Sequence, residues 1–289
     1  MAEIKIAGIM RAGAFSPNHI GNDAAIFNLV AEQLRKRGCE VNTYSEEQFM
    51  AGAVKENVIL NMCREMGSIR LLQEKEDAGA LVINSGYGIE NCIRERMTRI
   101  LLGLGIPYPE SLIVNTDEGV RDALRAAHIE RCWIKRGESH VMHKEDVCYV
   151  RHSEEAQEIL QEFFMRGIKR AVINRHLEGE LLKFYGVSGT DFFYWFYPVC
   201  DNPRRRADST VEAPAHMPQI SVEKLKAACQ KAADAVDVKI YGGDCIVAPD
   251  GSFTIIDFDD WPSFAPCRQD AAPHIARFVM NAIKEYQNK

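Results

Sequence analysis

The chain has 289 residues, of which 46% are hydrophobic and 26% are charged, so it is long enough for one large or two modest domains with buried cores. Its net charge of -6 argues against a general nucleic-acid binder, which needs a basic surface to neutralise phosphates. The sequence has no run near the ~18 apolar residues of a membrane-spanning helix, and its nine cysteines include no C-x-x-C pair. We therefore expect a cytoplasmic protein with reduced thiols and with no membrane or nucleic-acid partner.

The first third of the sequence alternates strands with helices. We expect strands at 4–10, 39–44 and 80–84 and helices at about 23–38 and 59–75. This alternation predicts a parallel sheet covered by helices on both faces. Ligands bind beyond the C-terminal ends of the strands of such sheets. Several polar side chains should therefore surround one crevice: Arg11, Ser16, Asn18, His19, Asn84 and Ser85.

A boundary near residue 108 is expected, because the prolines of Gly-Ile-Pro-Tyr-Pro at 105–109 end a helix predicted at 90–105. Mixed strands and helices follow, with strands at 111–114, 132–135, 171–174, 181–187 and 192–197 and helices at 118–127, 154–166, 222–235 and 271–286. A Pro- and Arg-rich insertion spans 201–219. Its arginines, Arg204 to Arg206, could hold an acidic group or lie in solvent.

The segment 241–264 predicts a β-hairpin that gathers carboxylates. The Asp-Gly pair at 250–251, between two apolar runs, indicates a two-residue turn that places Asp244 opposite Asp257. Asp259 follows on the same face. Because like charges placed opposite each other destabilise a sheet, we expect a cation between them, and Mg2+ prefers such oxygen ligands. The alternative is a solvated hairpin tip with uncompensated acids.

Lys135 ends an apolar strand and precedes a loop that contains Gly137, Ser139, His140 and His143. A lysine delivered into such a loop can hold phosphate oxygens, although an exposed lysine at a strand end is more common. The two histidines could act as bases or phosphate contacts, or lie in solvent.

Taken in order, the features from about 84 to 275 resemble the ATP-grasp superfamily. The helix before Gly-Ile-Pro-Tyr-Pro, Lys135 with its loop, the strand at 171–174 and the acidic hairpin follow one another as in that family. Within it, the sequence resembles ligases of the ribosomal-protein-S6-modifying type and the inositol-phosphate kinase branch. It shares with the kinases Lys183 and the pattern Asp-x-Asp-x-x-Pro-Ser-Phe at 257–264.

The resemblance implies an α/β fold in which an N-terminal parallel-sheet domain at 1–108 precedes a two-lobed α+β ATP-grasp domain. The central lobe, 109–178, would carry the phosphate loop and the adenine hinge. The C-terminal lobe, 179–289, would carry the metal site.

The resemblance also implies a set of site residues. Three cations would contact phosphate and act on developing negative charge: Arg94, which replaces the usual lysine, Lys135 and Lys183. The other nucleotide-binding residues would be Ser139 and His140 of the loop, Asn174, Arg175, His176 and Leu177 of the hinge, and Glu180 or alternatively Glu178 on the ribose. The metal ligands would be Asp244, Asp257 and Asp259, the last of which replaces the usual asparagine.

The function implied is that of a ligase which uses ATP and one or two Mg2+ ions to activate a carboxylate as an acyl-phosphate for attack by an amine or similar nucleophile. One alternative is a kinase that phosphorylates a hydroxyl. Another is a non-catalytic nucleotide-binding module, although such a module has no need to keep like charges together. No motif identifies the substrate, a small molecule or a peptide, and a homo-oligomer remains open.

Overall fold

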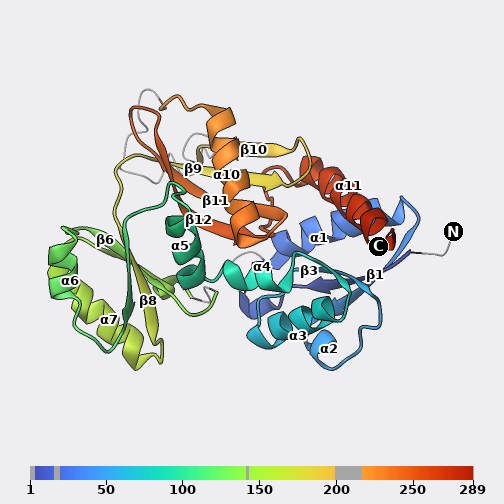
Figure 1. Ribbon diagram of the computed structural model, residues 1–289, viewed down its shortest axis with the longest axis horizontal. Helices are drawn as coiled ribbons and strands as arrows, with labels where there is room; N and C mark the ends of the chain where they lie inside the picture. The colour runs from blue at the N-terminus through green and yellow to red at the C-terminus, as the bar shows by residue number, and fades with distance from the viewer. Residues whose placement is uncertain (1–3, 16–19, 141–142, 199–216, 289) are drawn as a thin grey trace.

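The first sheet contains only parallel strands, as the sequence predicts (Figure 1). The structure is a computed structural model that describes residues 4–15, 20–140, 143–198 and 217–288. The strand order is β2-β1-β3-β4, with β1 Ile4–Met10, β2 Cys39–Ser45, β3 Val58–Asn61 and β4 Leu81–Ile83. The helices of this part are η1 Gly13–Phe15, α1 Ile20–Arg35, α2 Glu46–Met50 and α3 Met66–Asp77.

The prediction of a helix over 59–75 is wrong in its first half. Val58–Asn61 form β3, in which all four residues are buried, and the helix begins only at Met66. A short apolar run fits a central strand as well as a helical turn. The pairing of β3 with β1 on one side and β4 on the other decides in favour of the strand.

Two helices, α4 Gly86–Asn91 and α5 Arg94–Gly103, lead to a second, antiparallel sheet. Its order is β5-β8-β6-β7, with β5 Ser111–Asn115, β6 Cys132–Arg136, β7 Val147–Val150 and β8 Arg170–Arg175. The helices here are α6 Arg121–Ala126, η2 Lys144–Asp146, η3 Ser153–Glu155 and α7 Ala156–Met165. Figure 1 shows α6 and α7 on one side of this sheet, at the end of the molecule away from the termini.

A third, antiparallel sheet has the order β10-β9-β11-β12. Its strands are β9 Glu180–Val187, β10 Phe193–Phe196, β11 Ile240–Val247 and β12 Phe253–Asp260. Its helices are α10 Val222–Val236, which begins at the Ser221 cap, and α11 Arg268–Gln287. The three arginines at 204–206 lie outside the described residues.

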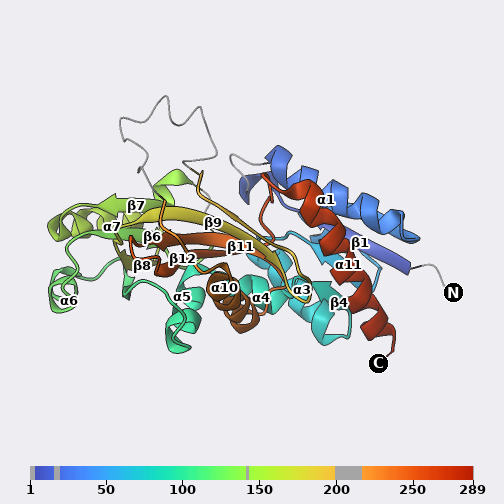
Figure 2. The ribbon, with the colours of Figure 1, turned by 90° about the horizontal axis from the view of Figure 1, so that it is seen from above.

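The C-terminal helix α11 packs beside α1 of the first part of the chain, as both views show (Figure 2). Their apolar faces share one core with Trp261 and Phe264, which follow β12 directly. The ring of Phe27 on α1 lies 5.9 Å from that of Trp261. The end of β12 is therefore fixed against the first sheet.

Asn84 also joins the first part of the chain to the third sheet. Its side-chain amide donates to the carbonyl of Ile240 (2.8 Å), and its oxygen accepts from the amides of Lys239 (2.9 Å) and Ile240 (3.0 Å). The prediction that Asn84 faces a ligand crevice is therefore wrong, because β11 satisfies its side chain. In the part of the chain described here, no helix combines the length and the apolarity needed to span a bilayer.

Candidate active site

Three charged side chains lie in one row across the third sheet. Lys183 on β9 is the register partner of Asp244 on β11, and Asp244 is the partner of Asp257 on β12. Directly paired residues project on the same face of a sheet, and Asp259 follows two residues after Asp257 on that face. The predicted pairing of Asp244 with Asp257 is confirmed.

The turn that produces this pairing differs from the prediction. The amide of Ala248 donates to the carbonyl of Ser252 (2.8 Å), which leaves a three-residue loop at 249–251, with Gly251 at a φ of 80°. Such loops need a residue in the left-handed region, and glycine adopts it without strain. A β-bulge then adds one residue to β12, since Cys245 faces Ile255 while Asp244 faces Asp257. The longer turn and the bulge compensate each other.

Each carboxylate of the pair is neutralised by a cation from another segment. The ammonium of Lys183 lies 2.7 and 2.9 Å from the two oxygens of Asp244. Arg94, at the start of α5, contacts both oxygens of Asp257, each at 3.2 Å. A two-point arginine–carboxylate contact fixes the geometry as well as the charge. The structure therefore brings Arg94 and Lys183, both predicted to contact phosphate, into direct contact with the acids.

Burial and unequal contact with cations separate the pKa values of the three acids. Burial would raise the pKa of Asp257, but Arg94 and Lys135 outweigh it and hold this pKa below its ordinary value. Burial raises the pKa of Asp244 despite the opposing charge of Lys183. Although 47% of the Asp259 side chain is exposed, the surrounding protein and the charge of Asp257 raise its pKa to about 6. A bound cation would relieve this repulsion.

Lys135 reaches the same patch from β6. It is 6% exposed, and its ammonium donates to the carbonyl of Ile256, next to Asp257 (3.0 Å). Burial, with the nearby charge of Arg94, lowers its pKa to about 8. The ammonium is therefore charged at neutral pH and is held by one carbonyl in the described structure, which leaves it able to bind an anion.

Several of these groups line a cavity of about 380 Å3 between the second and third sheets. They are Arg94, Lys135, Asp244 and Asp257. The segment 174–177, which includes the last two residues of β8, also lines the cavity. Four predicted site residues, Asn174, Arg175, His176 and Leu177, are thus brought to the cavity that holds the predicted phosphate-binding cations.

The remaining walls are apolar and were not predicted as site residues. They come from Trp133, Val147, Leu181, Ile246 and Ile256. Trp133 donates from its ring nitrogen to Nδ1 of His176 (3.2 Å), and its ring lies 5.0 Å from that of Tyr149. One sequence signal was available, since Leu181 and Ile246 lie two residues from Lys183 and Asp244 and so share their face.

Other predicted residues lie elsewhere among the described residues. Glu178 is 71% exposed and pairs with Arg131 (2.6 Å). Glu180 lines a different pocket with Pro218 and Val247, because neighbouring residues of β9 face opposite sides. Neither candidate ribose acid therefore lines the 380 Å3 cavity. Ser139 donates to the carbonyl of His140 (3.3 Å).

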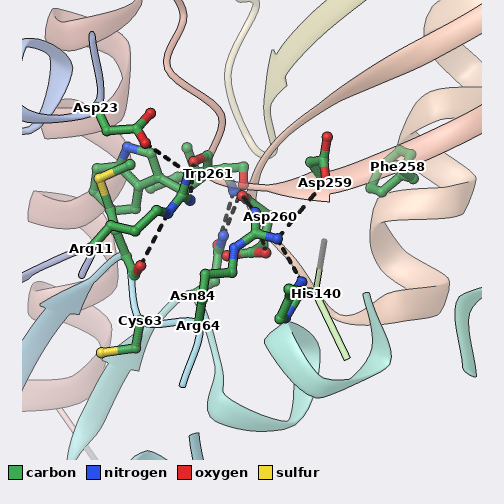
Figure 3. A network of polar contacts seen from close by, with 12 residues as sticks. Arg11, Asp23, Cys63, Arg64, Asn84, His140, Phe258, Asp259, Asp260 and Trp261 are labelled. Carbon is green, nitrogen blue, oxygen red and sulfur yellow. Dashed lines mark hydrogen bonds and ion pairs between the residues drawn. The ribbon is translucent and has the colours of Figure 1, made fainter. Parts of the chain in front are cut away.

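His140 is buried in a polar network with two arginines from the first part of the chain (Figure 3). Arg64 contacts Nδ1 of His140 at 2.6 Å and pairs with Asp260 at 2.9 Å. Arg11 pairs with Asp23 at 3.1 Å. Sequence reasoning missed Arg64 and Asp260, because nothing local marks a contact between residues 196 positions apart.

The other residues predicted to surround the crevice are only partly accounted for. Arg11 lies in the network just described, and Ser85 caps α4 by accepting from the amide of Gly88. Ser16, Asn18 and His19 lie outside the described residues.

The acid pair fits a Mg2+ ion that arrives with a phosphate-bearing ligand. Within the residues that the structure covers, no three His, Cys, Asp or Glu side chains converge into a ready metal cage. Asp244 and Asp257 instead attract two protein cations. Mg2+ usually takes one or two protein carboxylates and completes its shell with phosphate oxygens and water. The two acids would supply that partial shell, with Asp259 beside them.

Comparisons with known proteins give a match in structure only. No family model matches the chain, and no curated protein matches its sequence. The fold is similar to that of D-alanine–D-alanine ligase from Bacillus anthracis in complex with ATP, with a TM-score of 0.72, 13% identity, and coverage of 100% of this chain and 99% of that one.

Two further solved structures show the same likeness. The ATP-grasp ligase PsnB, in complex with the precursor peptide PsnA2 and AMPPNP, matches with a TM-score of 0.64 and 16% identity over 96% of this chain and 98% of that one. The D-cycloserine synthetase DcsG matches with a TM-score of 0.69 and 13% identity over 96% and 99%. The chain therefore has the ATP-grasp fold along its whole length.

Proposed function

We propose that this protein is an ATP- and Mg2+-dependent ligase that activates a carboxylate as an acyl-phosphate and joins it to an amine or a similar nucleophile. The observation that carries the proposal is one cavity lined both by apolar side chains, such as Trp133, Leu181 and Ile246, and by the charged groups of Arg94, Lys135, Asp244 and Asp257. This combination matches a nucleotide, which has a flat base and a charged phosphate tail. The solved structures of similar fold support it, since one holds ATP and another holds Mg and ADP.

The apolar walls would hold the adenine. Trp133, Leu181 and Ile246 offer flat or branched apolar surface, which favours a base removed from water. The hinge segment 174–177 borders the same space. These residues would orient the nucleotide so that its phosphates point along the cavity toward the acids.

At the other end, the chain's own charges would act on the phosphates. Arg94 and Lys135 would bind phosphate oxygens and stabilise the negative charge that develops as the terminal phosphoryl group leaves. Lys183 would move from Asp244 toward the phosphates when a metal takes its place. Mg2+ would be held by Asp244, Asp257 and Asp259 and would supply charge neutralisation and a fixed phosphate geometry.

The reaction needs no nucleophilic side chain from the protein. An oxygen of the substrate carboxylate attacks the terminal phosphorus, ADP leaves, and an acyl-phosphate forms. The amine then attacks the acyl carbon, and inorganic phosphate leaves. The part of the protein is to position the reactants and to stabilise charge.

The test is ADP formation from ATP across a panel of amino acids, short peptides and polyols, supplied singly and in pairs. A ligase forms ADP and phosphate only when a carboxylate and an amine are both present. A kinase, toward which Lys183 and the 257–264 pattern point, forms ADP with a single hydroxyl compound and leaves a phosphorylated product. If no pair and no single compound leads to ADP formation, both enzyme functions are contradicted and a non-catalytic binding module is favoured.

A further inference from the structure

We propose that Arg64 is a positioning residue that fixes the loop after Lys135 to the acid-bearing end of β12, and so sets the distance across the phosphate end of the cavity. This inference rests on the proposed function, because it assigns a role in binding ADP with Mg2+. It concerns a residue of the connection between β3 and α3 that lies outside the cavity lining described above.

The backbone of Arg64 is anchored by a buried carboxylate. Glu46 is 1% exposed and accepts hydrogen bonds from the amides of Arg64 (3.3 Å), Glu65 (3.1 Å) and Ala12 (2.9 Å). These amides follow β3 and β1, two adjacent strands of the first sheet. Arg64 therefore extends from a rigid base, and its side chain has little freedom to move away from its partners.

The guanidinium of Arg64 joins two segments that are distant in sequence (Figure 3). One terminal nitrogen contacts Nδ1 of His140 at 2.6 Å and lies 4.0 Å from a carboxylate oxygen of Asp259. The other donates to the carbonyl of Asp260 and pairs with its carboxylate, both at 2.9 Å. The side chain of Arg64 is only 10% exposed, so these contacts are shielded from water.

His140 meets Arg64 as a neutral acceptor. Burial, with the positive charges of Arg64 and Arg11, lowers the pKa of His140 well below its ordinary value. A neutral ring can accept at Nδ1 while its proton is on Nε2. The contact is therefore a hydrogen bond that Arg64 donates to His140. A positively charged side chain in place of His140 could not accept it.

The two joined segments both carry residues of the cavity lining, Lys135 on one and Asp257 on the other. His140 lies five residues after Lys135, and Asp259 lies two residues after Asp257. The intervening loop is already held at Gly137, whose carbonyl accepts from the amide of Glu95 (3.0 Å). Arg64 supplies the next fixed point, so the loop and the metal-binding strand cannot separate without breaking its contacts.

Arg11 offers a matched control within the same network. Its side chain is 8% exposed, close to that of Arg64, and it pairs with Asp23 and donates to the carbonyls of Met62 and Trp261. None of these partners belongs to the loop after Lys135. A change at Arg11 tests the loss of a buried guanidinium from the network without removing a contact of His140.

The experiment compares Arg64→Lys with Arg11→Lys by thermal unfolding and by calorimetric titration with ADP–Mg2+ and with adenosine. Lysine keeps the charge but cannot serve two partners with a planar fork. Both variants should lower the melting temperature. We expect Arg64→Lys alone to weaken ADP–Mg2+ binding, by fivefold or more, with adenosine affinity unchanged.

A third variant, His140→Ala, separates positioning from folding because it leaves the buried contacts of Arg64 with Asp260 in place. It should weaken ADP–Mg2+ binding by a similar factor. The variant that combines Arg64→Lys with His140→Ala should lose little more ADP–Mg2+ affinity than either single variant. The inference would be overturned if Arg64→Lys bound ADP–Mg2+ as tightly as Arg11→Lys does. It would also be overturned if the affinity losses of Arg64→Lys and His140→Ala multiplied in the variant that carries both changes. Neither result would contradict the proposed function. Failure of the unmodified protein to bind ADP–Mg2+ would overturn the proposed function as well.

Discussion

Asp244 and Asp257 lie directly opposite each other on β11 and β12, and each is held by a cation that comes from another strand or helix. The pair predicts that Mg2+ and nucleotide bind together. In the unmodified protein, ADP should raise the melting temperature more with Mg2+ than without it. Asp257→Asn should remove the Mg2+-dependent part of this rise in melting temperature. Each tenfold loss of affinity corresponds to about 3 °C.

The control for this variant is Asp250→Asn, which makes the same chemical change in the exposed turn of the same hairpin. It should keep the full Mg2+-dependent shift. Equal shifts in Asp257→Asn and the unmodified protein would show that the metal does not bind at this pair.

Lys135 should make nucleotide affinity depend on pH. Its pKa is lowered to about 8, so its ammonium is charged at pH 7 and mostly neutral at pH 9. Because only the charged form attracts phosphate, ADP affinity should fall as the pH rises through 8, by about tenfold between pH 7 and pH 9. Titration calorimetry at several pH values measures this. The arginine of Lys135→Arg stays charged throughout this range, so the ADP affinity of this variant should not change with pH. If its affinity fell with pH in parallel with that of the unmodified protein, Lys135 would be ruled out as the cause.

Trp133 should contribute to binding of the base and not of the phosphates. Trp133→Ala removes one apolar wall of the cavity, and we expect ADP binding to weaken about tenfold, equally with and without Mg2+. Phe164→Ala is the control, since Phe164 lies on the same lobe but is 51% exposed and outside the cavity lining. A loss at Trp133 that appears only with Mg2+ would contradict a base-binding role.

Gly243, next to Asp244, should tolerate no side chain. A Cβ atom there would lie 2.3 Å from the carbonyl oxygen of Asp257 and 2.7 Å from the ring of Phe184. Gly243→Ala should therefore cost about 1–3 kcal/mol of unfolding free energy. Gly103→Ala, at an open position in α5, should instead gain about 0.5–1 kcal/mol. Denaturant unfolding measures the unfolding free energy of both variants. Equal values would show that β11 can shift to accept a side chain at residue 243.

The acid pair was predictable because its signals are local. An Asp-Gly turn between two apolar runs indicates the hairpin, and alternation along its strands indicates that Asp244 and Asp257 share a face. The prediction assumed a two-residue turn, whereas the hairpin has a three-residue turn and a bulge that restores the register. A bulge leaves no clear trace in one sequence, since its residue, Ile256, only repeats the apolar Ile255 before it.

The rest of the site depends on contacts between distant segments. Arg64 and Asp260 meet only because β3 and the end of β12 converge in the fold, and β3 itself was expected to be helical. The apolar walls of the cavity look like ordinary core residues in the sequence. Asn84 shows the reverse case, since a polar residue at a strand end was expected to bind ligand and instead binds the backbone of β11.

The most direct test of the account follows the oxygen atoms of the carboxylate substrate. Once the substrate panel yields an active pair, the carboxylate is labelled with 18O and the products are followed by 31P NMR. The account predicts that inorganic phosphate carries one 18O atom from the carboxylate, because that oxygen attacks the terminal phosphorus and leaves with it. Unlabelled phosphate, or a phosphorylated organic product in its place, would contradict the acyl-phosphate mechanism.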